Sequence, residues 1–303
     1  MINGFVVIDK PAGITSHDVV SRVRRILGTR KVGHTGTLDP FATGVLPIAV
    51  NDGTKAIPFL DEGVKCYEAV MQLGVATDTL DMTGVVLRTA DWQTVTREEI
   101  ESVLKQFTGH LRQIPPMYSA IKQGGQPLYK LARRGQVVDR PAREIDVRSL
   151  ELLSFSPPLV SFRVVCSRGT YVRTLADDMG TILGCGGSLK ELRRIASGPF
   201  DISAAVTLEG LAGAAQLGTL EYLTVTPLAA LSHLQEIPLS DGGLALVRHG
   251  RSPTWPATEI SLSTACEEGT LVRLTHGGNL IAVAECRSCG AELPRIILKR
   301  VFV

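Results

Sequence analysis

The segment Gly33–Val50, GHTGTLDPFATGVLPIAV, places the strongest constraint on what this chain can fold into. Its glycines permit tight turns and close approach of the backbone to a ligand. The pair Asp39-Pro40 is typical of a turn that holds the carboxylate at a fixed position in a loop. The apolar run Gly44–Val50 favours a strand, which Pro47 restricts to a sheet edge or to extended backbone. Asp39 is therefore either a catalytic carboxylate or a structural Asx-turn residue.

Helical and strand-like periodicities both occur in the first 200 residues, and the helical segments begin at capping residues. Strands are predicted at Gly4–Asp9, Tyr67–Gly74 and Leu159–Cys166, and helices from Ser16 to Gly28, from Thr96 to Gly109, over Thr170–Leu183 and from Ser188 to Ala196. Residues 113–140 show little periodicity, and a loop of this length in a compact domain is usually functional or mobile. Residues 204–235 are interpreted as helix and linker.

Composition excludes several classes of protein. The chain has 303 residues, of which 44% are hydrophobic and 20% charged, as in globular proteins. No apolar stretch reaches the roughly 18 residues that span a membrane. The N-terminus lacks the basic and apolar regions of a secretory signal. Six cysteines are too few for a disulfide scaffold, so reduced thiols in a cytoplasmic protein are expected.

Charge is nearly balanced overall but uneven locally. There are 32 basic and 30 acidic residues, a net charge of +2. Phosphate binding depends on the local field, so local basic patches can bind a polyanion, although such residues are also common on solvated faces. The candidate phosphate contacts are Lys10, Arg22, Arg25, Lys122, Lys130, Arg133 and Arg134.

The pattern of apolar and turn-forming residues changes near residue 235, where we predict a domain boundary. From Ile237 onward, short apolar runs alternate with Gly-rich turns, which predicts a small β-barrel. Cys286 and Cys289 form a lone CxxC that Cys266 and His276 could complete as a metal site. Zinc sites normally show a second paired motif, so a turn with two buried thiols is preferred and no metal is expected.

Several motifs, taken together and in order, resemble those of the TruB family of pseudouridine synthases, which modify the T-loop uridine of tRNA. The resemblance covers about the first 200 residues and includes Gly33–Val50. The other matching segments are KPAGITS at 10–16, KCY at 65–67, TDTLD at 77–81, PPMYSAIKQGGQPLYKLARRG at 115–135, GTYVR at 169–173 and LRR at 192–194.

The resemblance implies an α+β pseudouridine synthase fold with a mixed, mainly antiparallel sheet around a central cleft. The catalytic domain would comprise residues 1–235, including an RNA-binding insertion at about 113–140 that closes over the T-arm. Residues 236–303 would form a PUA-like RNA-binding β-barrel.

The resemblance also implies roles for individual residues. Asp39 matches the nucleophilic aspartate, and Arg173 matches the arginine that pairs with it. Tyr67 matches the tyrosine that stacks on the target base, while Tyr171 and Leu192 match the apolar wall of the pocket.

Two further residues match motif positions with roles toward the RNA. His34 matches the histidine that fills the stack left by the flipped nucleotide. Asp81 matches an acid that contacts the RNA loop.

The implied function is isomerisation of a T-loop uridine to pseudouridine by a monomer that needs no cofactor, metal, membrane or obligatory protein partner. Attack by the aspartate at C1′ is favoured, and attack on the uracil ring is the other candidate. Three alternatives stay open: a non-catalytic RNA-binding or RNA-folding protein, a nucleoside hydrolase or uracil glycosylase that releases free uracil, and a guide-RNA-dependent relative of the same family.

Overall fold

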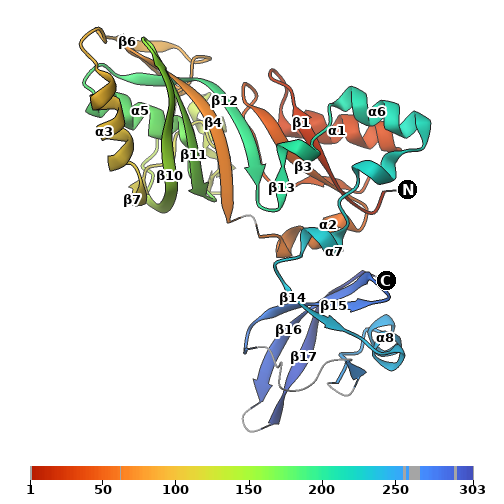
Figure 1. Ribbon diagram of the computed structural model, residues 1–303. Coiled ribbons are helices and arrows are strands. Elements are labelled where there is room, and N and C mark those ends of the chain that lie inside the picture. Colours follow the sequence, from red (N-terminus) through yellow and green to blue (C-terminus); the bar gives the residue numbers. More distant parts are fainter. Residues whose placement is uncertain (1, 62, 255–256, 259–266, 290–291, 303) are drawn as a thin grey trace.

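The computed structural model describes residues 2–61, 63–254, 257–258, 267–289 and 292–302. A nine-stranded sheet forms the body of the molecule, with smaller hairpins beside it and a separate C-terminal sheet (Figure 1). Along the main path its strands are β1 (Gly4–Lys10), β3 (Thr43–Val50), β12 (Gly187–Ser197), β4 (Val64–Leu73), β11 (Leu159–Ser167), β10 (Arg143–Ser156) and β7 (Gly109–Gln113). Off this path, β2 (Val32–His34) pairs with β3 and β13 (Phe200–Asp201) pairs with β12.

Strand β12 joins two halves of this sheet. It pairs with β4 antiparallel from Gly187 to Ser197, and with β3 parallel at two positions, 193 with 43 and 194 with 44. The other pairings in the sheet are antiparallel. The predicted mixed, mainly antiparallel sheet is therefore confirmed.

Helices cover each half of the sheet. Helices α1 (Ser16–Leu27) and α6 (Leu208–Leu217) lie against each other beside β1 and β3, while α3 (Arg97–Gln106) and α5 (Val172–Ile182) pack on the other half (Figure 1). The cap of helix α1 lies one residue earlier than predicted, because Thr15 rather than Ser16 forms the capping box with Asp18, and Gly28 ends the helix in the left-handed conformation. The predicted Thr96 capping box of α3 is confirmed.

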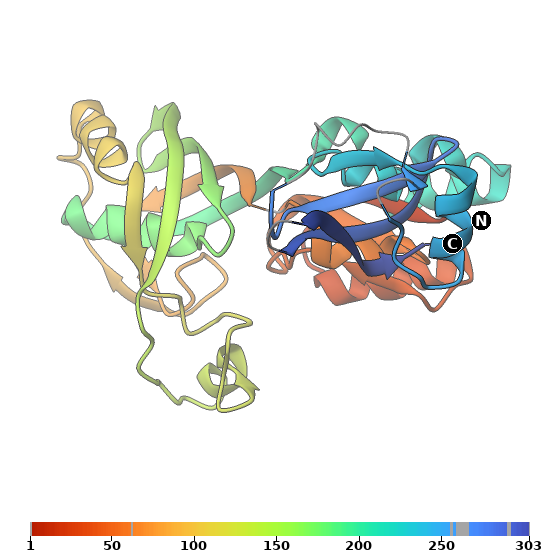
Figure 2. The ribbon, with the colours of Figure 1, turned by 90° about the horizontal axis from the view of Figure 1, so that it is seen from below.

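Residues 113–140 project from the half of the sheet that carries α3 and α5 (Figure 2). They contain only the short hairpin β8 (Lys122–Gln123) with β9 (Gln126–Pro127), and the single turn α4 (Leu128–Ala132). A second hairpin, β5 (Val75–Thr77) with β6 (Val86–Thr89), stands beside the main sheet. The remaining short helices are α2 (Gly53–Ala56) and α7 (Pro227–Ala230), with 3₁₀ turns at Ile57–Phe59, Ile202–Ala204 and Leu220–Leu223.

The prediction of a helix from Ser188 to Ala196 is wrong, because this segment is the central strand β12. Ser188 and Glu191 mimic a capping box, but the Ser188 hydroxyl donates to the carbonyl of Val75 instead, at 2.7 Å. Strands on both sides of β12 satisfy its backbone, so tertiary pairing overrides the local helix signal.

Pro47 lies inside a sheet, and the structure explains how β3 accommodates it. The Thr35 amide donates to the Pro47 carbonyl, which therefore points away from the antiparallel partner β1. In such a pair the N and C=O of one residue point to the same side. The nitrogen of Pro47, which carries no hydrogen, thus faces the gap between β12, which pairs with residues 43 and 44 of β3, and β2, which pairs with residues 48–50. No hydrogen bond of the sheet is lost at Pro47.

The C-terminal strands form a four-stranded sheet in the order β14 (Gln235–Pro238), β15 (Leu271–His276), β16 (Asn279–Cys289) and β17 (Glu292–Val301), with α8 (Asp241–Arg248) beside it. Over the residues that the structure describes, this sheet is not closed into a barrel. Its inner face has its own core, which includes Val272 and Leu274. A second apolar cluster joins the C-terminal residues Leu280 and Val283 to Phe5 and other residues of the main sheet.

The cysteines differ partly from the expectation. Cys66, Cys166 and Cys185 are free thiols, as predicted. Cys286 is buried and disulfide-bonded, so the expectation of reduced thiols is wrong at this position. The side chains of Cys266 and Cys289, which the CxxC hypothesis also invoked, lie outside the described residues.

Candidate active site

The loop that carries Asp39 is fixed through the backbone on both sides of this residue. The Ser16 hydroxyl accepts from the Leu38 amide at 2.9 Å and donates to the Leu38 carbonyl at 3.1 Å. On the other side, the Pro40 carbonyl accepts from the Lys10 ammonium at 3.2 Å and from the Gly13 amide at 2.8 Å. The segment 10–16 thus holds the Asp39 loop in place.

Asp39 opens onto a cavity of about 170 Å³ between the two halves of the sheet. Four other predicted site residues line this cavity with it, namely Tyr67, Tyr171, Arg173 and Leu192. The remaining wall is formed by Thr37, Leu38, Lys65, Ser119, Ala120, Gly169, Thr170 and Val172. Segments far apart in the sequence are therefore brought together around one carboxylate.

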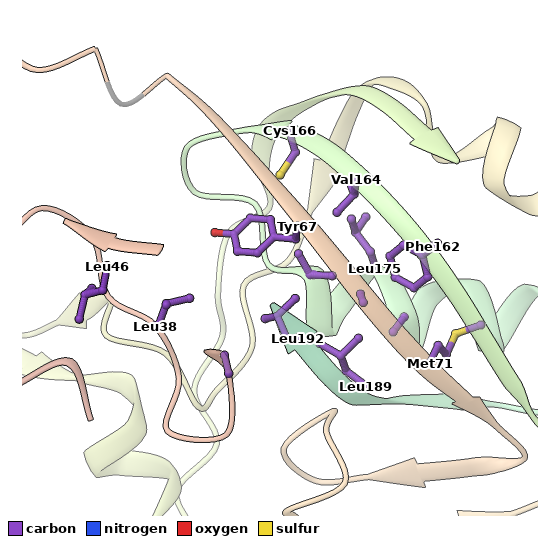
Figure 3. Packing of buried hydrophobic residues seen from close by; sticks show 14 of the residues in the cluster. Leu38, Leu46, Tyr67, Met71, Phe162, Val164, Cys166, Leu175, Leu189 and Leu192 are labelled. Carbon is purple, nitrogen blue, oxygen red and sulfur yellow. The ribbon is translucent and has the colours of Figure 1, made fainter. Parts of the chain in front are cut away.

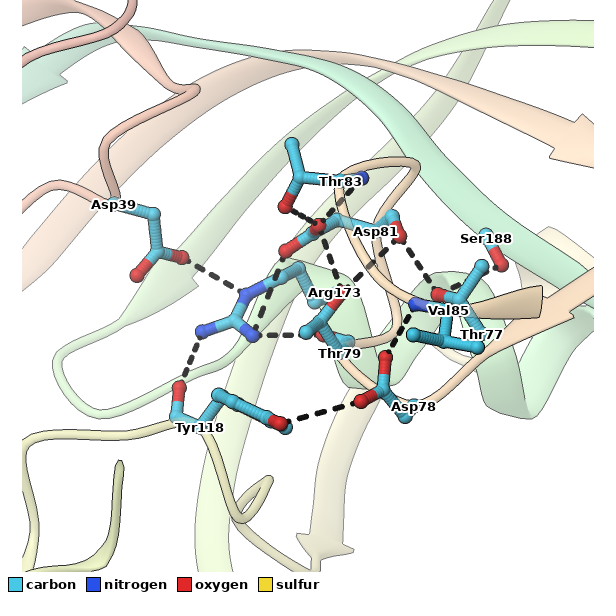
Figure 4. Close-up of polar contacts among 10 residues, drawn as sticks. All are labelled: Asp39, Thr77, Asp78, Thr79, Asp81, Thr83, Val85, Tyr118, Arg173 and Ser188. Atoms are coloured by element: carbon cyan, nitrogen blue, oxygen red, sulfur yellow. Dashed lines mark hydrogen bonds and ion pairs between the residues drawn. The ribbon is translucent and has the colours of Figure 1, made fainter. Parts of the chain in front are cut away.

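Arg173 connects Asp39 to two other segments (Figure 4). Its side chain is 4% exposed, and its Nε lies 2.8 Å from Oδ2 of Asp39. Nη1 donates to the carbonyl of Thr79 at 2.8 Å, and Nη2 donates to the carbonyl of Tyr118 at 2.7 Å. The second carboxylate, that of Asp81, lies 3.7 Å from Nη1. A guanidinium bound in this way holds a carboxylate ionised and oriented.

Opposing influences set the protonation of Asp39. Burial raises the pKa of the Asp39 carboxyl above the ordinary value, and the nearby Asp81 raises it further. The ion pair with Arg173 and the charge of Lys10 lower it. The Asp39 side chain is half-buried and open to the cavity, and a carboxylate held ionised in such a place is suited to nucleophilic attack.

Two aromatic side chains and one leucine form the less polar part of the cavity. Tyr67 is 7% exposed and Leu192 is 8% exposed, and both extend from neighbouring strands of the main sheet (Figure 3). Burial raises the pKa of both Tyr67 and Tyr171, which favours neutral phenols. Tyr171 is held through its backbone by Gln113, which accepts from its amide at 2.8 Å and donates to its carbonyl at 3.0 Å. Such walls can stack on a planar base.

His34 and Asp81 lie outside the set of described residues that line the cavity. His34 is in β2, opposite Ile48 of β3. Asp81 is 4% exposed, and its carboxylate accepts from the Thr79 hydroxyl and the Thr83 amide while facing Arg173. The predicted RNA contacts of these two residues stay predictions.

The sequence reasoning missed residues that act through the backbone. Ser16 is predicted only as a helix cap and Tyr118 has no predicted role, although both are in the segments that carry the family resemblance. Lys10 was predicted only as a phosphate contact, but it is fully buried and its ammonium donates to the carbonyls of Pro11, Ile14 and Pro40. The sequence signal for these backbone contacts is the presence of a lysine and a serine at the two ends of one Pro/Gly turn, residues 10–16.

We expect Lys10→Met to lower the free energy of unfolding by about 2–4 kcal/mol at pH 7, because buried carbonyls lose their donor. Burial lowers the pKa of Lys10 to about 8, below its ordinary value of 10.5. Between these values the unfolded chain binds more protons than the folded one, so wild type gains stability relative to Lys10→Met as pH rises from 8 to 10. Urea unfolding at several pH values measures this difference.

Lys105→Met, in the exposed last turn of α3, is the matched control and should change the unfolding free energy little at any of these pH values. A wild-type advantage over Lys10→Met that stays constant or shrinks above pH 8 would contradict the prediction.

Comparison with known proteins identifies the family. Two family models match consecutive parts of the chain: the N-terminal domain of the TruB family pseudouridylate synthases over residues 24–172, and the tRNA pseudouridylate synthase B C-terminal domain over residues 173–228. The chain belongs to the TruB family. Membership makes it a tRNA pseudouridine synthase, which is an isomerase.

Relatives of the TruB family match the chain over its full length. The tRNA pseudouridine synthase B of Geobacter sulfurreducens is 53% identical over 303 residues, which cover 99% of this chain and 100% of the relative. The enzyme of the same name from Pseudomonas paraeruginosa is 40% identical and matches 98% of this chain and 96% of its own.

Solved structures show the same fold. A chain in an H/ACA RNP bound to a substrate RNA containing 2′-deoxyuridine matches with a TM-score of 0.76 and 26% identity, covering 99% of this chain and 85% of its own. A chain of a Cbf5-Nop10-Gar1 complex matches with a TM-score of 0.75 and 29% identity, and the match covers 99% of this chain and 85% of that chain. The predicted α+β pseudouridine synthase fold is confirmed. Within the described part of the chain, every helix is too short or too polar to cross a membrane.

Proposed function

We propose that this chain isomerises a uridine in the T-loop of tRNA to pseudouridine, with Asp39 as a covalent nucleophile. The observation that carries the proposal is the Asp39 carboxylate, which opens onto the cavity and is held by the Arg173 Nε at 2.8 Å. Tyr67, Tyr171 and Leu192 supply walls for a planar ring beside it. The names of the relatives support tRNA as the substrate.

The proposed reaction exchanges one glycosidic bond for another. The Asp39 carboxylate attacks C1′ of the ribose, and the N1–C1′ bond breaks with its electron pair leaving on uracil. The base then turns, its C5 attacks C1′, and the bond to Asp39 breaks. C5 loses its proton and N1 gains one, so the step is redox-neutral. The Tyr67 phenol lies in the cavity wall, where it can stack on the ring while it turns.

The uridine must leave its stack to reach Asp39, because a base that is stacked inside a folded loop cannot enter the cavity that Asp39 lines. His34 would fill the space that it leaves. Residues 113–140 would close over the T-arm: they project from the body of the protein (Figure 2) and Arg173 binds their Tyr118 carbonyl. We also propose two domains, residues 1–235 for catalysis and residues 236–303 as a PUA-like RNA-binding module.

The test uses an unmodified tRNA transcript with tritium at C5 of uridine and the purified chain alone, without added metal, nucleotide, guide RNA or protein partner. The expected result is tritium release with pseudouridine mapped to the T-loop, and no free uracil. A transcript with cytidine at the mapped position is the matched control and should release no tritium.

Each alternative function has its own outcome in this test. Free uracil would identify a hydrolase or glycosylase instead. Binding of the transcript without tritium release, followed by release once a guide RNA and partner proteins are added, would favour a guide-RNA-dependent relative of the family. Binding without release under any condition would favour an RNA-binding or RNA-folding protein.

A further inference from the structure

Arg194 is a fully buried arginine at the junction of the two half-sheets. Its accessible surface is 0%. The register of β12 places it opposite Gly44 of β3 on one side and opposite Tyr67 of β4 on the other. Side chains directly opposite each other in an antiparallel pair lie on the same face of a sheet. The guanidinium therefore shares the face of Tyr67 and of Leu192, two residues before it, which both line the cavity.

Two nitrogens of Arg194 fix the two ends of the Asp39 loop. Nε donates to the carbonyl of Val45 at 2.7 Å, and Nη2 donates to the carbonyl of Gly36 at 3.1 Å. Asp39 lies between these two acceptors in the sequence. Because a guanidinium is planar and rigid, it sets the distance between the loop ends. Gly44 allows the approach, since a Cβ there would lie 2.2 Å from the Arg194 carbonyl oxygen.

The third nitrogen, Nη1, is buried and has no hydrogen bond within the described residues. Tyr67 lies directly opposite Arg194 in the register of β12 and β4. The guanidinium nevertheless acts on the Tyr67 hydroxyl, because it lowers the pKa of that group against the raising effect of burial. A buried cation is costly unless it is hydrogen-bonded, and the carbonyls of Val45 and Gly36 compensate two of the nitrogens of Arg194.

Hydrogen-bond chemistry then defines what Arg194 does to Tyr67. A guanidinium has donors only, so in any hydrogen bond between Arg194 and Tyr67 the phenol oxygen must accept. The phenolic hydrogen then points away from Arg194. Tyr67 lines the cavity, so its hydrogen becomes available to the base bound there.

We propose that Arg194 is a positioning residue of the isomerisation, which couples the Asp39 loop to the Tyr67 hydroxyl through one guanidinium. The inference rests on the proposed function, because it assigns Arg194 to that reaction. Arg194 is fully buried and is not among the described residues that line the cavity, so it does not touch the substrate in this proposal. It acts by holding two groups that face the uridine in one geometry.

The test is a double-mutant cycle of Arg194→Lys and Tyr67→Phe, measured as single-turnover pseudouridine formation and as tRNA affinity. Lysine keeps the buried charge but cannot reach two carbonyls and a hydroxyl at once. We expect Arg194→Lys to lower the rate about 100-fold through misplacement of the reacting groups, with the Kd for tRNA within about 3-fold of wild type. In the Tyr67→Phe background, the same change should cost less than about 10-fold, because one of its targets is already absent.

The matched control is Arg193→Met, the adjacent residue, whose guanidinium forms a partly exposed ion pair with Asp9 at 2.7 Å. It should leave the rate within about 3-fold of wild type. Full additivity in the cycle, no effect of Tyr67→Phe, a rate of Arg194→Lys near that of wild type, or failure of Arg194→Lys to fold would each overturn the proposal. If the wild-type chain forms no pseudouridine, the proposed function itself fails, which is a separate outcome.

Discussion

We expect Asp39→Asn to abolish pseudouridine formation while the protein stays folded and binds tRNA. The amide cannot form the bond to C1′, so we expect the single-turnover rate to fall by at least about 10⁴-fold, as for other nucleophile deletions. The side chain keeps its size, and its loop is held by Ser16 and Lys10 through backbone atoms that the change does not touch. Tritium release from C5-labelled transcript measures the rate, and filter binding measures the affinity for tRNA.

Asp91→Asn is the matched control, because it makes the same chemical change at an exposed Asx turn whose carboxylate accepts from the Gln93 amide. It should have wild-type activity. Turnover by Asp39→Asn within 10-fold of wild type would exclude Asp39 as the nucleophile and, with it, the proposed mechanism.

Arg173→Met should damage both stability and catalysis. The buried guanidinium is the shared partner of Asp39, Asp81 and the carbonyls of Thr79 and Tyr118, so its loss leaves acceptors and a buried carboxylate without compensation. Breaking a buried pair from one side costs about 3–5 kcal/mol. We expect a loss of this size in urea unfolding, and a fall in activity of at least about 10³-fold from the misplaced nucleophile.

The pH dependence separates this effect from simple loss of structure. In the proposed mechanism only the ionised Asp39 attacks, so we expect the rate to fall as pH decreases through the pKa of Asp39, which burial raises above the ordinary value and Arg173 lowers. Removing Arg173 therefore moves the acid limb of the pH–rate profile to higher pH. Arg168→Met, an exposed arginine just before α5, should shift neither the profile nor the stability. An unshifted acid limb in folded Arg173→Met would contradict the assigned ion pair.

The fold could be predicted from the sequence where a local signal agrees with the tertiary environment. Thr96 and Glu99 signal a helix, and the apolar face of α3 then packs on β10. Ser188 and Glu191 carry a similar signal, but their segment pairs with β3 on one side and β4 on the other. The hydrogen bonds of these two pairings outweigh the stabilisation that a helix cap would give. Strand β10 is hard to predict because, beyond the buried Ile145 and Val147, its residues are exposed or half-buried with no clear alternation.

The site was predictable to the extent that its residues carry side-chain chemistry. Asp39 and Arg173 are in recognisable motifs, and the structure brings them into contact. The contacts of Arg173 with Thr79 and Tyr118 could not be predicted, because any residue supplies the same backbone carbonyl. Lys10 and Arg194 were equally hidden, since basic residues are usually at the surface and their burial here depends on carbonyls distant in the sequence.

The central position of β12 has a consequence for the chain while it is being synthesised. Strands β1, β3 and β4 emerge from the ribosome early, but the strand that joins β3 to β4 follows more than 100 residues after β4. Until then, each half-sheet has an open edge that can pair with non-native strands. The cavity also lacks Leu192, and the Asp39 loop lacks its hydrogen bonds to Arg194. We therefore expect a nascent chain whose β12 has not yet left the ribosome to be inactive and prone to aggregation. Completion of this one strand closes both edges and creates the enzyme in the same step.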